Sequence, residues 1–248
     1  MKKLLDRIFI DGLGGMAQGL FATLIIGTII QQIGLFMGGG TGDLIYELGK
    51  IAAGLTGAGI GVGVARKLEA GHLVIVSAAV VGMIGAFAGK ILSGQVLVDG
   101  NLVLAGPGEP LGAFAAAYLA IEIGILISGK TKLDIILTPL VCIGTGSAVG
   151  LFVGPPISEF MLWLGSLINW GTEQQPFLMG IVVSVLMGMI LTLPISSAAL
   201  GVILNLSGLA AGAATIGCCC NMIGFAVASW RENKFSGFLA QGIGTSML

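Results

Sequence analysis

GLGGMAQGLFATLIIGTIIQQIGLFM, residues 12–37, indicates the fold class of this chain, because it contains no Asp, Glu, Lys or Arg over 26 residues. A membrane-spanning helix needs about 20 mostly apolar residues. The stretch is therefore long enough to cross a bilayer. Asp11 directly before this stretch and Gln18 within it interrupt the apolar run that follows Arg7, and no clear small-residue cleavage site follows, so we interpret the run as a retained first helix and not as a secretory signal.

The composition of the whole chain agrees with this interpretation. Of its 248 residues, 56% are hydrophobic and 9% are charged, and the mean hydropathy is +1.05. An ordinary soluble domain carries about 25% charged residues. We therefore expect an all-α polytopic membrane protein that does not bind nucleic acid.

The Lys and Arg residues mark one side of the membrane. Nine of the eleven fall into four short clusters between apolar stretches. The clusters are Lys2, Lys3 and Arg7; Arg66 and Lys67; Lys130 and Lys132; and Arg231 and Lys234. Because cytoplasmic loops retain such residues, we expect the clusters and the amino terminus on the cytoplasmic side.

About six full spans connect these clusters. We expect them at residues 12–37, 44–64, 73–92, 111–128, 135–153 and 177–193. Asp99 and Gly100 stand between two aliphatic runs and predict a small extracellular β-hairpin near residues 95–104. Trp163 and Trp170 predict a short helix that lies in the membrane interface within residues 155–176.

Residues 198–230 do not fit a single span. The sixth span should end on the cytoplasmic side at residues 194–197. Arg231 and Lys234 should lie on that side too, so the chain between them cannot cross the membrane only once. We expect a short re-entrant or half-helix hairpin that turns near residues 210–215. Irregular backbone at membrane depth is buried in protein or lines a cavity, and such segments indicate substrate sites in transporters.

Polar side chains within the spans are the candidate functional residues. Glu109 lies in GPGEP directly before a helix, where it either accepts hydrogen bonds from a polyol or faces the outside water. Glu122 either pairs with a buried partner or belongs to a proton or substrate path. Asn205 and Asn221, on the two arms of the expected hairpin, either face one cavity or hydrogen-bond between helices.

Three other charged residues, Glu47, Lys50 and Lys90, have simpler interpretations. Glu47 and Lys50 are three positions apart on one helical face, where they form either a coupling pair or an interfacial ion pair. Lys90, near the end of a span, can extend its ammonium group to the interface. The 43 glycines predict close helix packing.

The sequence shows none of the catalytic, metal or nucleotide motifs of a soluble enzyme. His72 is the only histidine, so no His-based metal site or catalytic triad can be assembled. No Gly-rich phosphate loop with Lys and Ser or Thr is present, which argues against an ATP-driven pump acting alone. Cys142 and the adjacent cysteines 218–220 are interpreted as small buried hydrophobes. We expect a transporter without catalytic residues, cofactor or metal.

Four segments carry a resemblance to a known family. They are DRIFIDGLGGMAQGLFATLIIGTII at 6–30, GPGEPLGAF at 106–114, KTKLDIILTPL at 130–140 and GCCCNMIGFAV at 217–227. Together they resemble the EIIC-like membrane proteins of the bacterial phosphotransferase system, in the group that includes the perfringolysin O toxin regulator. The resemblance implies a helical homodimer in the bacterial cytoplasmic membrane, with a midplane substrate site built from re-entrant hairpins.

The resemblance also assigns site residues. GPGEP is similar to the Gly-Ile-Thr-Glu-Pro loop of sugar-specific EIIC proteins, whose Glu binds the sugar, and the match implies this role for Glu109 with Pro110. It further implies one EIIC-type transmembrane domain over residues 1–248, with a truncated C-terminus as an alternative because sugar-carrying members are longer. No EIIA or EIIB domain is fused to it, so phosphotransfer would need separate cytoplasmic partners.

Three functions follow from the residues and the resemblance. The first is EIIC-type transport of a small polar, sugar-like solute, with Glu109, Asn205, Asn221 and Glu122 lining one path. The second is a gradient-driven carrier of the same fold, in which Glu122 or Glu47 couples protons. The third is a membrane sensor that regulates toxin or metabolic genes through a partner bound at residues 66–72 or 130–134.

Overall fold

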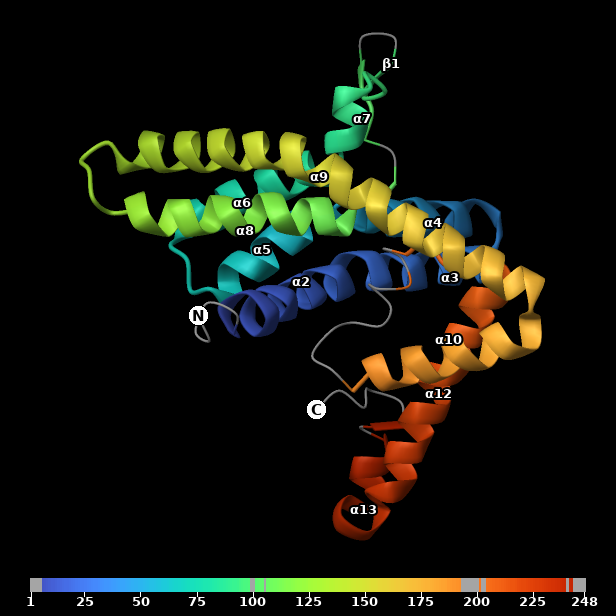
Figure 1. Ribbon diagram of the computed structural model, residues 1–248. Helices are drawn as coiled ribbons and strands as arrows, with labels where there is room; N and C mark the ends of the chain where they lie inside the picture. Colours follow the sequence, from blue (N-terminus) through green and yellow to red (C-terminus); the bar gives the residue numbers. More distant parts are fainter. Residues whose placement is uncertain are drawn as a thin grey trace. The chain divides into compact units, whose positions relative to one another are not determined.

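The computed structural model describes residues 6–98, 101–104, 106–192, 201, 204–239 and 241–242 (Figure 1). It consists of two compact units, Met1–Glu159 and Phe160–Leu248. Apart from one pair of two-residue strands, the regular structure of the described residues is helical. The all-α architecture expected from the composition is therefore confirmed.

Unit 1 begins with a continuous helical stretch from Arg7 to Met37. Within it, two α-helical and two wider π-helical segments alternate: η1 (Arg7–Gly12), α2 (Leu13–Leu20), η2 (Phe21–Ile25) and α3 (Ile26–Met37). The elements that follow are α4 (Gly39–Gly54), α5 (Thr56–Lys67), α6 (His72–Ala86), α7 (Ala88–Leu92), β1 (Leu97–Val98), β2 (Asn101–Leu102), α8 (Pro110–Ile127) and the first part of α9 (Asp134–Gln174).

Glycines hold the first two helical stretches together. A β-carbon at Gly19 would collide with the carbonyl group of Gly59, and one at Gly27 would lie 2.6 Å from the backbone nitrogen of Ala53. The helix from Arg7 to Met37 therefore runs antiparallel to α5 and α4 at backbone contact distance. Small residues permit this approach where lipid offers no hydrophobic drive for association.

Glycine contacts also join α5 and α6 to α8, the helix that begins directly after Glu109. Gly61 of α5 abuts the carbonyl of Ala78 in α6, and Gly85 of α6 lies so close to α8 that a β-carbon there would be 2.5 Å from the Gly112 carbonyl oxygen. Helix α6 thus packs between α5 and α8 (Figure 1). The expectation that the glycines form packing faces is confirmed at these crossings.

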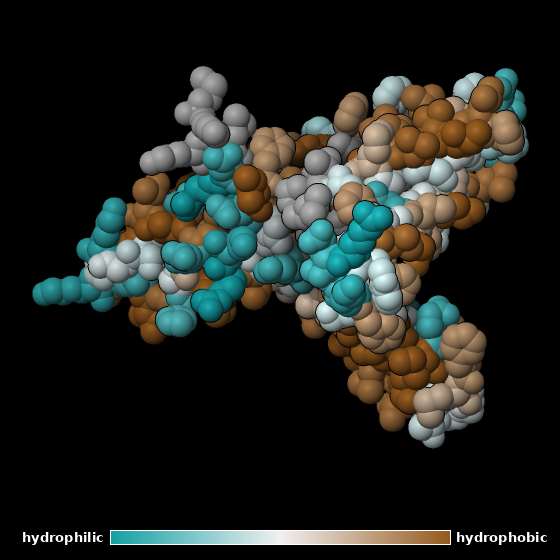
Figure 2. Space-filling model, turned by 90° about the horizontal axis from the view of Figure 1, so that it is seen from below, coloured by the Kyte–Doolittle hydropathy of each residue, from teal (hydrophilic) through white to brown (hydrophobic). Residues whose placement is uncertain are grey.

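The outer surface is apolar, as a protein dissolved in lipid requires. Large hydrophobic side chains on several helices are mostly exposed, among them Phe36 at 88% and Phe152 at 82%. Figure 2 shows apolar surface over much of the face that it draws. In water this exposure would be costly, because about 25 cal/mol is lost for each Å² of apolar area left in contact with water.

The number of long spans is lower than expected. Among the described residues, four helical stretches are long and apolar enough to cross a membrane: Arg7–Met37, Pro110–Ile127, Asp134–Ile157 and Gly208–Ala228. A fifth candidate is the pair α4 and α5, which is bent by 50°. The spans expected at 73–92 and 177–193 correspond to α6 and α10 (Pro176–Ile190), which have 15 residues each and are short for a 30 Å bilayer core.

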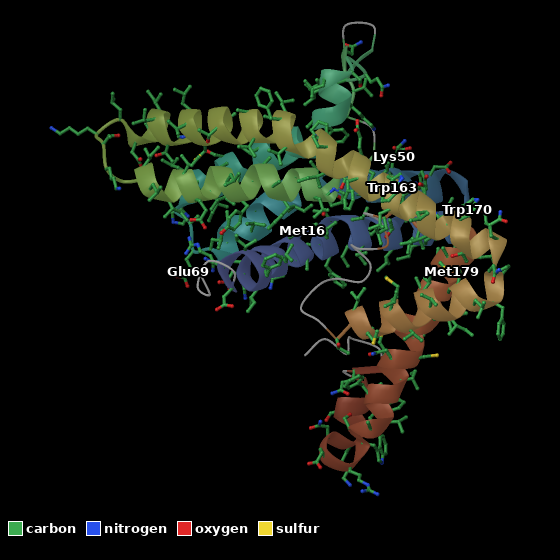
Figure 3. All side chains as sticks on the ribbon, viewed as in Figure 1. Met16, Lys50, Glu69, Trp163, Trp170 and Met179 are labelled. Atoms are coloured by element: carbon green, nitrogen blue, oxygen red, sulfur yellow. The ribbon has the colours of Figure 1, made fainter. Side chains whose placement is uncertain are left out.

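Three of the basic clusters share one end of unit 1. The side chain of Arg7 contacts Glu122 near the end of α8, and Lys67 approaches the first helix at Gly14. Gly71, before α6, lies beside the hydroxyl of Ser128, which precedes Lys130. Figure 3 places Glu69 at this end and Lys50 far from it. This agrees with the expected segregation, whereas the membrane side on which this end lies remains a prediction, and Lys2 and Lys3 lie outside the described residues.

The strand pair is smaller than the predicted hairpin. Leu97 pairs with Leu102 and Val98 with Asn101 in antiparallel register. The turn residues Asp99 and Gly100 lie outside the described residues. The extracellular position of this pair stays a prediction.

Unit 2 contains the end of α9, α10, α12 (Gly208–Ala228) and α13 (Trp230–Leu239). Two expectations are wrong here. Residues 155–174 do not form a separate helix, because they belong to α9, which extends through Pro155 and Pro156 to Gln174. The span-long apolar part of α9 ends at Ile157, and the interfacial position of the residues after it stays a prediction. The chain also does not turn at 210–215, since α12 passes through these residues. Most of residues 193–203, including 194–197, lies outside the described residues.

The reason for the second error is the packing of α12 against α10. Gly217 abuts the carbonyl of Ser184, and the Ser184 hydroxyl donates to the carbonyl of Ala213 at 2.5 Å. Glycine and alanine in this stretch are therefore contact residues of a helix crossing. Their composition alone resembles that of a chain break.

Candidate functional site

Several helix interruptions in unit 1 converge on Ala86. Helix α6 ends there because Phe87 has φ −111° and ψ 12°, outside the helical region, and α7 starts at Ala88. The break between α4 and α5 is nearby, since a β-carbon at Gly57 would lie 2.8 Å from that of Ala86. Interrupted helices expose backbone groups that a continuous helix would satisfy internally.

Two further irregular segments reach the same place. A β-carbon at Gly108, in the loop before α8, would lie 2.8 Å from the Ala86 carbonyl oxygen. A β-carbon at Gly154 of α9, directly before two prolines, would lie 3.4 Å from that of Ala88. The two helix breaks, the GPGEP loop and the proline-containing part of α9 thus surround one point of unit 1.

Glu109 is held at this point by backbone hydrogen bonds. Its N–H donates to the carbonyl oxygen of Ala86 at 2.7 Å, and its carboxylate accepts the N–H of Leu111 at 3.2 Å. The carboxylate therefore caps α8, where the helix dipole favours negative charge. Pro110 occupies the first helical position and restricts Glu109 to its extended conformation, φ −98° and ψ 111°.

Gly108 makes this geometry possible. Its φ of +71° lies in the left-handed region, and its α-carbon faces the backbone of Ala86 with no room for a side chain. Gly106 also has a positive φ, of +86°, but no atom lies within 4 Å of its β-carbon position. The sequence Gly-Pro-Gly-Glu-Pro therefore encodes both the turn and the contact of Glu109 with the broken helix.

The arrangement suits recognition of hydroxyl groups. Glu109 is half-buried, and an ionised carboxylate can accept about four hydrogen bonds through its two oxygens. Hydrogen bonds to a charged acceptor are shorter and stronger than those between neutral groups. A carboxylate beside irregular backbone can thus orient a polyol without any chemical step.

Glu122 forms an ion pair with Arg7. The Arg7 guanidinium donates to both of its carboxylate oxygens, Nε to Oε1 at 2.6 Å and a terminal nitrogen to Oε2 at 3.3 Å. Glu122 lies thirteen residues after Glu109 in α8, which corresponds to about 20 Å along the axis. The structure therefore does not bring these two carboxylates into one cavity.

The other charged candidates form a surface pair. The Lys50 ammonium lies 3.7 Å from the Glu47 carboxylate, and their side chains are 64% and 60% exposed. The predicted pairing is confirmed. Exposed pairs of this kind contribute little to stability. Lys90 is exposed on α7, and its ammonium lies 5.4 Å from the centre of the Phe87 ring.

The two asparagine candidates belong to unit 2. Asn221 of α12 donates to the carbonyl of Gly188 in α10 at 2.7 Å, which is the helix-to-helix bond weighed as the alternative to substrate binding. Asn205 has φ +48° and an exposed side chain, in the turn before α12. The structure describes no cavity that these two side chains share.

Two polar residues were missed from the sequence. Asn169 of α9 donates to the Asn205 carbonyl at 3.0 Å and accepts the Ser207 N–H at 3.1 Å, so it holds the turn before α12. Thr56 is fully buried at the break between α4 and α5, where its hydroxyl donates to the Ala53 carbonyl at 2.6 Å. Their signal was a hydrogen-bonding side chain within an apolar run.

Within the described parts of the chain, the His, Asp, Glu and Cys side chains are those that could bind a metal, and the Cys side chains could react as thiols. There, no group of three or more His, Cys, Asp or Glu side chains is placed to hold a metal ion. Cys142 is buried against Gly124, as expected. Cys219 and Cys220 are exposed on α12, so the interpretation of all four cysteines as buried is wrong for these two.

The apolar helices and their interruptions define the class of an integral membrane protein with a transporter-like core. The family model described as "Phosphotransferase system, EIIC" matches residues 10–248. The chain belongs to this family. It is thus a membrane component of the sugar-transport type. No curated protein matches the chain significantly.

Proposed function

We propose that this protein binds a small polyhydroxylated, sugar-like solute and carries it across the bacterial cytoplasmic membrane, with Glu109 as its principal acceptor. One observation supports the proposal above all others. The backbone of Glu109 is bonded to Ala86 at the end of a broken helix while its carboxylate caps the next helix. In transporters, substrates bind where helices are discontinuous.

Pro110 belongs to this site through its effect on the backbone of Glu109. Asn205 and Asn221 are secondary candidates for the solute path. Glu122 would join this path when its ion pair with Arg7 separates. We further propose that residues 1–248 act as one EIIC-type transmembrane domain and as a homodimer. The end that carries Arg7, Arg66 and Lys130 would face the cytoplasm, where separate phosphotransferase partners would meet it.

The gradient-driven carrier is the less supported alternative. It requires Glu122 or Glu47 to take up and release a proton in each cycle. Both carboxylates have a cationic partner, Arg7 and Lys50 respectively, which would have to separate each time. The sensor alternative would use the loops at 66–72 and 130–134, which lie at one end of unit 1 and could meet a cytoplasmic partner together.

The test is a ligand-stabilisation screen of the detergent-purified full chain with sugars, sugar acids, amino acids and sulfur compounds. A solute present at 100 times its Kd stabilises the folded state by about 2.7 kcal/mol. The same screen is applied to Glu109→Gln, which keeps an oxygen that can accept the Leu111 N–H. Glu47→Gln is the matched control, because it also removes one carboxylate from unit 1.

We expect a sugar to raise the melting temperature of the parent protein and of Glu47→Gln but not of Glu109→Gln. A sugar response that survives in Glu109→Gln would contradict the assignment of the site. A response only to compounds other than sugars would contradict the solute class and favour the carrier or the sensor.

A further inference from the structure

Helix α13 begins directly after a helix that is long enough to cross the membrane. Only Ser229 separates it from α12, one of the four span-long apolar helices among the described residues. The length of α12 is about 32 Å, which matches the thickness of the hydrocarbon core. The two ends of α12 therefore lie at the two membrane surfaces when it spans the bilayer, and α13 starts at one of them.

The exposed apolar face of α12 reaches the start of α13. Spacings of seven, seven and four positions place four large exposed side chains on one face of this helix. They are Leu209, Ile216, Ile223 and Val227. Trp230 follows three positions later and is 46% exposed. Because the chain is an integral membrane protein, a long apolar face of this kind suits contact with lipid, and the lipid boundary falls close to Trp230.

Helix α13 is bent into a compact turn. Lys234 has φ 51° and ψ −145°, outside the helical region. The ring centroids of Trp230 and Phe238 lie 5.8 Å apart with the rings edge to face, whereas eight positions of a straight helix span about 12 Å. After the turn the chain returns to α12, since a β-carbon at Gly242 would lie 3.3 Å from that of Ala226. The turn thus stays at the end of α12 (Figure 1).

The exposed side chains of this turn are aromatic and basic. Phe235 is 62% exposed, and Arg231 and Lys234 are exposed as well. Neither cation forms an ion pair with another described residue. Glu232 is the one acidic residue of α13, so the helix carries a net positive charge. Aromatic residues are enriched at the boundary between lipid and water, and cations beside them attract anionic lipids.

We propose that α13 lies in the membrane interface, where Trp230 and Phe235 contact the upper parts of the acyl chains and Arg231 and Lys234 bind the phosphates of anionic phospholipids. The bend at Lys234 makes this position possible. A straight helix of this length, in line with α12, would instead extend about 15 Å beyond the span. The inference rests on the membrane integration of the chain and not on the role of Glu109.

The depth of Trp230 tests the first half of the proposal. The chain has three tryptophans, and Trp163→Phe together with Trp170→Phe leaves Trp230 as the only one. Both replaced side chains are mostly exposed on α9, so the exchange should preserve the fold. The full chain is placed in vesicles whose lipids carry bromine either near the headgroup or near the chain end. We expect stronger quenching of Trp230 fluorescence by the shallow bromine, and weak quenching by aqueous iodide.

The headgroup preference tests the second half. Phosphatidylglycerol and phosphatidylcholine with the same brominated chains are each added at the same low fraction to vesicles that contain both lipids. A net charge of one favours the anionic lipid about fivefold, so brominated phosphatidylglycerol should quench Trp230 up to about fivefold more strongly. The double variant Arg231→Gln, Lys234→Gln should lose this preference. Glu232→Gln is the matched control, because it removes the opposite charge from the same turn and should increase the preference.

Thermal unfolding of each variant establishes that it is folded, and Glu109→Gln should behave like the parent, which separates this interface from the solute site. Stronger quenching by iodide than by either brominated lipid would place α13 in water and overturn the proposal. Protection of Trp230 from all quenchers would also overturn it, by placing α13 against protein such as a second copy of the chain. Equal quenching by the two headgroup classes, or a preference that survives in the double variant, would exclude the two cations as lipid-binding groups.

Discussion

Arg7 and Glu122 lie 115 positions apart in the chain, and their side chains meet at 2.6 Å. The contact ties the first turn of the first helix to the last part of α8, whose other end carries Glu109. The two side chains are 39% and 31% exposed, so the pair is screened only in part. Such a pair fixes the relative position of two helices at the basic end of unit 1.

This ion pair should be measurable as a coupling. Arg7→Gln and Glu122→Gln should each lower the free energy of unfolding in detergent, and the double variant should lose less than the sum. We expect a coupling energy of about 1 kcal/mol. The same cycle on Glu47 and Lys50, an exposed pair in the same unit, should give about 0.3 kcal/mol. Equal coupling in both cycles would contradict the structural importance of the Arg7 contact.

Gly108→Ala should disturb the Glu109 loop more than Gly106→Ala does. Both glycines have positive φ, so each substitution costs about 1–2 kcal/mol of backbone strain. Only at Gly108 would the new methyl group also collide with Ala86. Thermal unfolding should therefore show a larger loss for Gly108→Ala, together with loss of the solute response. Similar values for both variants would mean that the loop does not need its contact with α6.

Replacing glycine by alanine should have opposite effects at a glycine that packs against another helix and at one that does not. Gly19→Ala should destabilise unit 1 by about 1–3 kcal/mol, because the methyl group would meet the Gly59 carbonyl and overpack the crossing. Gly144→Ala, in α9 with no atom within 4 Å, should stabilise by up to about 1 kcal/mol through helix propensity. Denaturation of the purified variants in detergent measures both. A tolerated Gly19→Ala would contradict the close packing of these helices.

Asn169→Ala should loosen the turn before α12. The substitution removes the donor to the Asn205 carbonyl and the acceptor of the Ser207 N–H, each bond contributing about 1 kcal/mol. Hydrogen exchange at residues 204–208 should become faster while the exchange of α5 and α6 in unit 1 is unchanged. Asn205→Gly is the control, since glycine accepts the positive φ at this position. Unchanged exchange in Asn169→Ala would show that the turn is held by other contacts.

The features that depend on local sequence were predicted well. The runs at 12–37, 111–128 and 135–153 are long enough to span a bilayer by composition alone, and helices lie over each of them. Glu47 and Lys50 pair because three positions bring side chains together on any helix. The place of Glu109 before α8 followed from the Gly-Pro-Gly-Glu-Pro pattern, since glycine and proline act on their own backbone.

Which helices are interrupted, and which residues they contact, depends on the tertiary structure. The convergence on Ala86, the partner of Glu122 and the continuity of α12 depend on residues distant in the chain, such as Arg7 for Glu122 and Ser184 for Gly217. Apolar length and turn chemistry are properties of neighbouring residues and can be read along the chain. Backbone contact between glycines depends on which helix faces them, and the same glycine-rich composition supports either a break or a close crossing.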